Sequence, residues 1–194
     1  MSVTASRIRE AALSRFASKG YDAASLAEIA ADVGIKKPSI YAHFSGKEAL
    51  FASLLELSVQ EEVAFAENRM FEEKSAGRAL KSYLEATPQR YGKSPHLRFW
   101  LRAAYLPPTG LLPEVTNSVL FYGAQLQRIV DELLTRLEAE NRLKMDRHTL
   151  GAAYIGILRG LHANLLYQGP ADTGKMFEAM WLVFEQAAFL DDDH

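Results

Sequence analysis

The sequence predicts an all-α protein of about nine helices. Apolar residues recur at helical spacing through most of the chain, and no segment shows the strict alternation of a half-buried strand. Glycine and proline interrupt this periodicity at intervals that suit helix ends. We therefore expect a three-helix N-terminal domain at residues 1–47, joined by a long helix to a helical body at residues 48–194.

Composition excludes several classes of protein. The chain has no cysteine, which rules out disulfides, thiolate metal sites and cysteine nucleophiles, and fits a reducing cytoplasm. We expect no signal peptide, and no stretch approaches the ~20 apolar residues of a membrane span. The net charge of −2 hides an asymmetry, because residues 1–47 hold seven Lys or Arg and four Asp or Glu. We expect a cytoplasmic protein without a membrane partner, whose basic end suits DNA.

The first helices have recognisable ends. Helical spacing predicts a helix over residues 4–19, ended by a glycine. Ser25 and Glu28 form the pattern of a capping box, in which each side chain accepts from the other residue's backbone N–H group. Pro38 opens a short third helix that carries Ile40, Tyr41 and Phe44. Between the capping box and Pro38, the spacing of apolar residues predicts a helix with one apolar face, ended by a glycine in a left-handed conformation. These residues are Leu26, Ile29, Ala30, Val33 and Gly34.

Two short helices joined by a tight turn with a glycine are typical of a helix-turn-helix. In such a motif the second helix enters the major groove of double-stranded DNA by its N-terminal end. Here that end carries Lys36, Lys37 and Ser39, whose side chains can donate to phosphates and base edges. The spacing alone also fits an ordinary helical hairpin with a solvated, charged end.

The residues of this region are more specific than their spacing. The segments SLAEIAADVG and IKKPSIYAHFSGKEALF closely resemble the signature of the TetR family of bacterial transcriptional regulators, over about Thr4 to Leu54. Ala42 stands where many members carry a larger polar or aromatic residue. Five residues match position for position: Tyr41, His43, Phe44, Lys47 and Glu48. The resemblance implies a DNA-binding head with the candidate contact residues Ser25, Lys36, Lys37, Pro38, Ser39, Tyr41, His43 and Lys47.

Prolines and glycines divide the remaining chain into further helices. A long helix over residues 47–70 should leave the head and enter the body. Pro88 should bend or end the helix after it, and Asp172 or Thr173 should cap the last helix. The other expected helices cover residues 78–91, 95–106 and 114–141 and the segment from the cap Asp146 to Gly169.

The last helix is too apolar to face water all round. From Met176 to Leu190, 12 of 15 residues are apolar, so this helix must be covered on two sides. One cover is the body itself, and the other is most simply a second copy of the chain, which predicts a homodimer. The acidic tail Asp191–His194 is expected to be disordered. The preceding helix carries small residues that permit close approach to a second copy or to its neighbour in the body: Ala152, Gly156, Gly160 and Ala163.

No residues in the body have the spacing of a catalytic site. The histidines lack a metal-binding pattern such as HExxH, and there is no glycine-rich phosphate loop, so we expect no enzyme activity, no cofactor and no metal. Aromatic and polar side chains on apolar helices instead suit a cavity for a small, mostly apolar effector. The candidate ligand-binding residues are Phe99, Trp100, Arg102, Tyr122, Gln125, Tyr154, His162 and Asn164.

Family resemblance and helical pattern together favour a one-component regulator. It is expected to bind a palindromic DNA operator as a dimeric repressor and to leave it when an effector binds the body. The alternative from a different class is a helical carrier or enzyme whose basic head is incidental.

Overall fold

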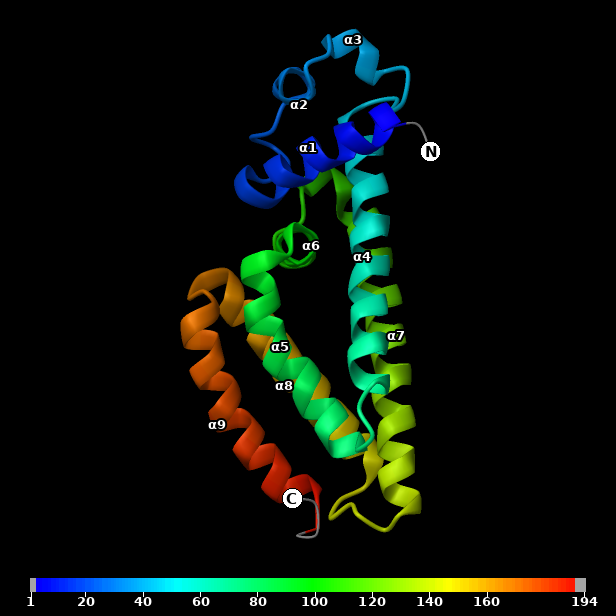
Figure 1. Ribbon diagram of the computed structural model, residues 1–194, viewed down its shortest axis with the longest axis vertical. Helices are drawn as coiled ribbons and strands as arrows, with labels where there is room; N and C mark the ends of the chain where they lie inside the picture. Colours follow the sequence, from blue (N-terminus) through cyan, green and yellow to red (C-terminus); the bar gives the residue numbers. More distant parts are fainter. Residues whose placement is uncertain (1–2, 191–194) are drawn as a thin grey trace. The chain divides into compact units, whose positions relative to one another are not determined.

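Residues 3–190 are described by a computed structural model, and they are almost entirely helical (Figure 1). Within this range the only strand-like contact is an isolated bridge between Leu143 and Phe189, so the prediction of an all-α fold is confirmed. The tail Asp191–His194 lies outside the described residues. The helices are α1 (Val3–Lys19), α2 (Leu26–Val33), α3 (Lys37–Ile40), α4 (Lys47–Phe71), α5 (Ala76–Lys93), α6 (Pro95–Tyr105), α7 (Leu112–Ala139), α8 (Arg147–Tyr167) and α9 (Pro170–Ala188), with a 3-10 turn η1 (Thr109–Leu111) before α7.

The chain folds into two compact units, and the division falls within α4 and α7. The first unit comprises Met1–Glu62 and Ser94–Leu120, and the second comprises Val63–Lys93 and Phe121–His194. The predicted boundary at residue 47 separates a DNA-binding part from a ligand-binding part, whereas these two units are defined by compactness. The boundary therefore stays a prediction. Among residues 3–190, no helix is long and apolar enough to cross a bilayer.

An aromatic cluster forms the core of the first unit. Phe16 of α1, Phe51 of α4 and Phe99 of α6 are buried, and the ring centroids of Phe51 and Phe99 lie 5.1 Å apart. The turn after α1 is closed by Gly20, whose φ of 83° is left-handed. Arg102 of α6 lies directly against this turn, because a Cβ added to Gly20 would come within 2.9 Å of its Nε. Helix α6 therefore supports the C-terminal end of α1, along which it packs.

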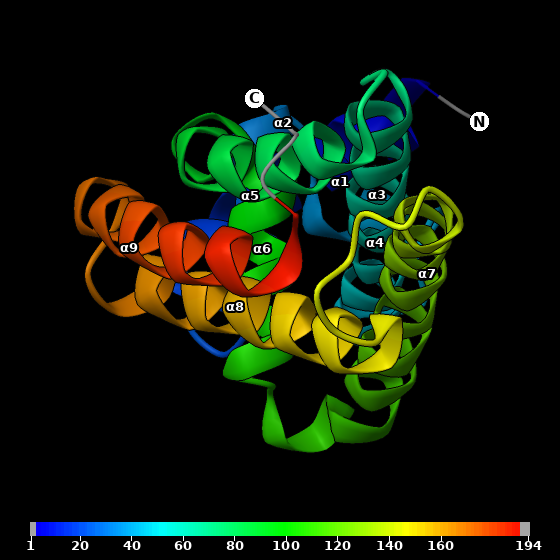
Figure 2. The ribbon, with the colours of Figure 1, turned by 90° about the horizontal axis from the view of Figure 1, so that it is seen from below.

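In the second unit, α5, α8 and α9 pack against one another (Figure 2). Tyr154 of α8 is fully buried, and its hydroxyl donates to the backbone carbonyl of Leu80 in α5 at 2.8 Å. Burial raises the pKa of Tyr154 well above its usual value, so the hydroxyl keeps the proton that this bond needs. On α9, Trp181 and Phe184 lie with ring centroids 5.4 Å apart. Aromatic side chains are thus part of the core between these helices.

Prolines account for the helix ends that were predicted wrongly. Of the two outcomes predicted for Pro88, it does not end α5 but lies buried within it, where packing of the helix offsets the one backbone bond that a proline removes, and a bend at Pro88 stays a prediction. Helix α9 is capped by Gly169 and opened by Pro170, not capped by Asp172 or Thr173. A proline suits the first helical position because no N–H group is needed there. Thr173 is buried instead, and its hydroxyl donates to the Gly169 carbonyl at 2.7 Å.

Candidate nucleic-acid interface

The turn between α2 and α3 is built from local hydrogen bonds. The predicted capping box is present: Ser25 Oγ accepts from Glu28 N at 3.2 Å, and the Glu28 carboxylate accepts from Ser25 N at 3.1 Å. At the other end of α2, Gly34 has a φ of 72°, which a side chain would strain. The next N–H group, from Ile35, donates back to the carbonyl of Ala30 at 3.0 Å. Both ends of α2 are thereby closed, and the chain turns sharply into α3.

Helix α3 presents polar side chains to solvent and is anchored by two apolar ones. Ile40 and Phe44 are buried, and they attach the short helix to the rest of the first unit. Tyr41 is 51% exposed despite its large ring, because the anchors on either side direct it outward. The side chains that share this exposed surface are Lys36, Lys37, Pro38, Ser39, Tyr41 and His43. Six of the eight candidate DNA-contact residues are therefore exposed to solvent at or directly beside α3.

The other two candidates, Ser25 and Lys47, make bonds within the protein. The Ser25 hydroxyl belongs to the capping box, although the residue itself is exposed. The Lys47 ammonium donates to the carbonyl of Ala24 at 2.8 Å and lies 4.1 Å from the centroid of the Tyr21 ring. These bonds tie the start of α4 to the segment just before α2. Contact of Ser25 and Lys47 with phosphate stays a prediction.

Two arginines of α1, which were not among the predicted site residues, hold α2 in place. Arg15 donates to Asp32 at 2.8 Å and to Glu28 at 2.7 Å, and the hydrogen bond from Arg15 lowers the pKa of Asp32. Arg7 donates to the carbonyl of Val33 at 2.8 Å, where the last turn of α2 needs donors. The spacing of Arg7 and Arg15 places them near one face of α1, which was the available signal. Their partners could not be identified from sequence.

The eight candidate ligand-binding residues are divided between the two units. In the first unit, Phe99 and Trp100 are buried, and Arg102 lies against Gly20 as described above. In the second unit, Asn164 donates to the Thr173 hydroxyl at 3.0 Å, and Tyr154 bonds to Leu80. Gln125 is half-buried on α7. These contacts are sufficient to explain the side chains structurally, and their ligand role stays a prediction.

Two candidates in the second unit do come together with a residue that was missed. The hydroxyl groups of Tyr122 and Tyr83 are 2.9 Å apart, and the rings of Tyr122 and His162 have centroids 6.5 Å apart. His162 is 4% exposed, and burial lowers its pKa to about 3, so the imidazole is neutral near pH 7. Nothing local marked Tyr83, because its partner lies 39 positions away in the sequence. Among residues 3–190, no group of three His, Asp or Glu side chains could hold a metal ion.

The N-terminal part of the chain matches a known protein family. The family model described as bacterial regulatory proteins, tetR family, matches residues 8–54. The HTH-type transcriptional repressor ComR of Escherichia coli K12 is 40% identical over 83 residues. That match covers 40% of this chain and 40% of ComR, so the chain spans about two fifths of the relative's length.

The fold of the whole described chain also has counterparts among solved structures. The fatty acid degradation regulator FadR from Bacillus halodurans has a TM-score of 0.74 at 18% identity, covering 95% of both chains. The TetR family regulator PfmR from Thermus thermophilus has a TM-score of 0.69 at 19% identity, covering 93% of this chain and 97% of that one. The matched family model thus identifies residues 8–54 as the N-terminal part typical of bacterial regulatory proteins of the tetR family, and the solved structures show that the whole described chain shares its fold with regulators such as PfmR.

Proposed function

We propose that this protein is a transcriptional regulator that binds double-stranded DNA through α3. The observation that carries the proposal is the surface around α3, where Lys36, Lys37 and Ser39 are exposed while Ile40 and Phe44 are buried. Donors held on a rigid, anchored helix end suit phosphates and base edges. The position also fits a helix-turn-helix, in which the second helix enters the major groove. Repression is the direction suggested by the name of the relative ComR.

A homodimer is part of this proposal, with its contact on the α8–α9 face. Val183 of α9 is 68% exposed and Met145 is also exposed, although both are apolar. Gly156 leaves open space on this face, since a Cβ added there would meet nothing within 4 Å. Burial of such a face against a second copy would remove apolar area from water. The face surrounds a shallow depression of about 560 Å³ lined by Met145, Thr149, Leu150, Ala153, Ile157, Ala179, Met180, Val183, Phe184 and Ala187.

A dimer would place two α3 helices on a palindromic operator, with half-sites about 34–36 Å apart.

We further propose that a small, mostly apolar effector binds the body and weakens operator binding. The cluster of Tyr83, Tyr122 and His162 supports this, because it offers a few polar groups within an apolar unit. Such coupling is reciprocal, so the operator must weaken effector binding by the same factor. We infer no enzymatic activity, and a DNA partner implies action in the cytoplasm.

The test begins with selection of bound sequences from a pool of random DNA duplexes. We expect a palindrome to be enriched, and its affinity in gel shifts to fall steeply with salt. Lys37→Ala should lower the slope of log affinity against log salt by about 1.8, because a dimer loses one phosphate contact in each of its two protomers. Lys175→Ala, which removes an exposed lysine of α9, is the matched control and should leave the slope unchanged. A pool that enriches no sequence would overturn the proposal and favour a carrier or an enzyme.

A further inference from the structure

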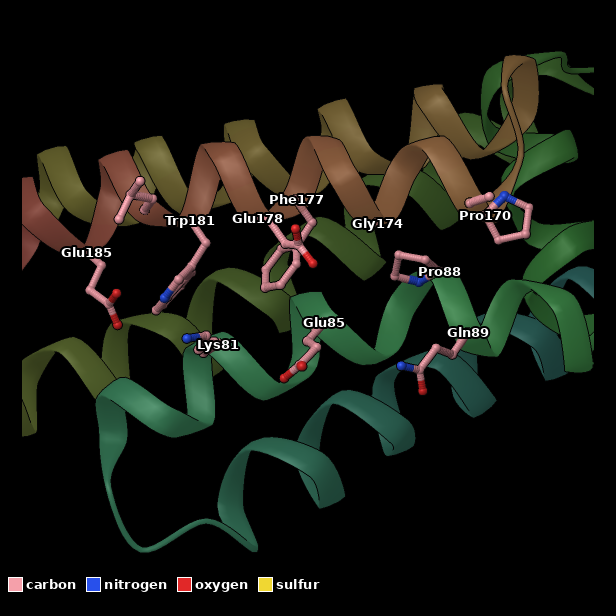
Figure 3. Close-up of a pocket in the computed structure, with 12 residues that line it drawn as sticks. Lys81, Glu85, Pro88, Gln89, Pro170, Gly174, Phe177, Glu178, Trp181 and Glu185 are labelled. Atoms are coloured by element: carbon pink, nitrogen blue, oxygen red, sulfur yellow. The ribbon is translucent and has the colours of Figure 1, made fainter. Parts of the chain in front are cut away.

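A groove runs between α5 and α9 in the second unit (Figure 3). Its volume of about 690 Å³ lies within the range of small-molecule sites, roughly 300–1,000 Å³. It involves neither α3 nor the residues that line the α8–α9 depression, apart from sharing α9. The groove is therefore separate from both contacts proposed above. Its lining residues are Lys81, Glu85, Pro88, Gln89, Pro170, Ala171, Gly174, Phe177, Glu178, Trp181, Leu182 and Glu185.

The groove has an acidic rim. Glu85 comes from α5, and Glu178 and Glu185 come from α9, while Lys81 is the one cationic side chain of the lining (Figure 3). The lining thus carries a net charge of −2. Among residues 3–190, no lysine or arginine forms an ion pair with any of these three carboxylates. The rim therefore has negative charge to offer a cation from solution.

The wall beneath the rim is aromatic. Phe177 and Trp181 of α9 are buried, with ring centroids 6.3 Å apart. The Lys81 ammonium lies 6.0 Å from the centroid of the Trp181 ring, so a cation already occupies the edge of this aromatic surface. Cations are attracted to the faces of indole rings by the negative charge of the π system. A ligand cation at this place would compete with Lys81.

Trp181 also has an unsatisfied hydrogen-bond donor. The residue is only 3% exposed, and its Nε1 has no hydrogen-bond partner among the described residues. In Figure 3 the indole extends from α9 toward α5, across the groove. A buried N–H group without an acceptor is rare in folded proteins. A ligand with an oxygen acceptor would satisfy it once Lys81 moves aside.

We propose that the α5–α9 groove binds an organic cation that carries an aromatic ring and an oxygen acceptor. The carboxylates Glu85, Glu178 and Glu185 attract its charge, and Phe177 and Trp181 contact its ring. The oxygen accepts from Trp181 Nε1. The proposal does not rest on DNA binding, so its test uses the full chain without DNA.

Benzoylcholine is a suitable probe because it combines a phenyl ring, an ester carbonyl and a trimethylammonium group. Two matched compounds each remove one feature. Phenylbutyltrimethylammonium lacks the acceptor, and the dimethylbutyl ester of benzoic acid replaces the ammonium nitrogen by carbon. In calorimetric titrations we expect benzoylcholine to bind most tightly, with affinity about fivefold lower for each matched compound. Equal affinity of the charged and neutral esters would overturn the proposal.

Two substitutions in the groove should change the affinity for benzoylcholine in opposite directions. Lys81→Met removes the competing cation and should raise benzoylcholine affinity about threefold, a gain that misfolding cannot produce. Glu178→Gln should lower it about threefold. Lys175→Met, on α9 but outside the groove, is the control and should change it little. Unchanged or weaker binding by Lys81→Met, or no saturable binding of benzoylcholine at millimolar concentration, would refute the site.

Discussion

The buried His162 should make the protein less stable in mild acid. Burial lowers its pKa from 6.5 to about 3 in the folded protein, whereas the imidazole of an unfolded chain has the ordinary value. Between these two pH values the unfolded state binds the proton and the folded state does not. Unfolding is therefore favoured as pH falls, and the stability that neutral His162 preserves is fully present above about pH 6.5 and lost progressively toward pH 3.

The size of the effect follows from the same two values. Each pH unit within the window changes the free energy of unfolding by about 1.4 kcal/mol. Between pH 7.5 and pH 5.0, one and a half of those units lie below 6.5, so the loss is about 2 kcal/mol. The carboxyls of Glu28 and Asp32 have lowered pKa values, so their contribution is lost at lower pH, below their ordinary 4.5 and 3.8. They do not obscure the histidine between pH 7.5 and pH 5.0.

The assay is urea unfolding at both pH values, with the protein concentration held constant because association also stabilises a folded chain. The comparison is between the unmodified protein and His162→Gln, whose amide does not titrate. We expect the pH-dependent loss to be about 2 kcal/mol smaller in the variant. A lower stability of the variant at both pH values does not matter, since only the difference between them is used. If both proteins lost the same stability, His162 would be accessible to protons and this reasoning would fail.

Two further predictions concern single positions. Gly20→Ala and Gly34→Ala should each destabilise the protein by more than about 1 kcal/mol in thermal or urea unfolding, because both positions have a positive φ, and the Arg102 guanidinium beside Gly20 ends a flexible side chain that can move aside; no loss at either position would contradict the strain. Val183→Glu should convert the dimer to monomers in analytical ultracentrifugation. Leu182 is a similarly exposed apolar residue that lines the α5–α9 groove instead, so Leu182→Glu should leave the dimer intact. If the unmodified protein is already a monomer, the proposed α8–α9 contact is refuted.

Local chemistry explains which parts of the fold could be predicted from the sequence. The capping box of Ser25 and Glu28 and the left-handed Gly34 depend on residues at most a few positions apart, and they are present as expected. Periodicity likewise located all the long helices. That α5 continues past Pro88 could not be predicted, because tolerance of a proline within a helix depends on burial against other helices, which no local pattern records.

The candidate sites were less predictable because their contacts are distant in the sequence. Residue type suggested Tyr154 and Asn164 as ligand groups, yet the Tyr154 hydroxyl bonds to a carbonyl 74 positions away. The acidic groove between α5 and α9 was not anticipated at all, since Glu85 and Glu178 become neighbours only when these helices pack. The surface around α3 could be anticipated, because its exposed donors and buried anchors lie within nine consecutive residues, 36–44.

Lys47 shows how one residue of the family signature can serve the fold and the proposed DNA contact together. Its ammonium is held by the Ala24 carbonyl, directly before the Ser25 cap of α2. Because the lysine begins α4, this bond joins α4 to the start of the helix-turn-helix through a side chain rather than through the intervening residues. A shift of the first turn of α4 must therefore either move the start of α2 or break the bond. The lysine at this position of the family signature thus has a structural role in joining α4 to α2, beside the DNA contact that is proposed for it.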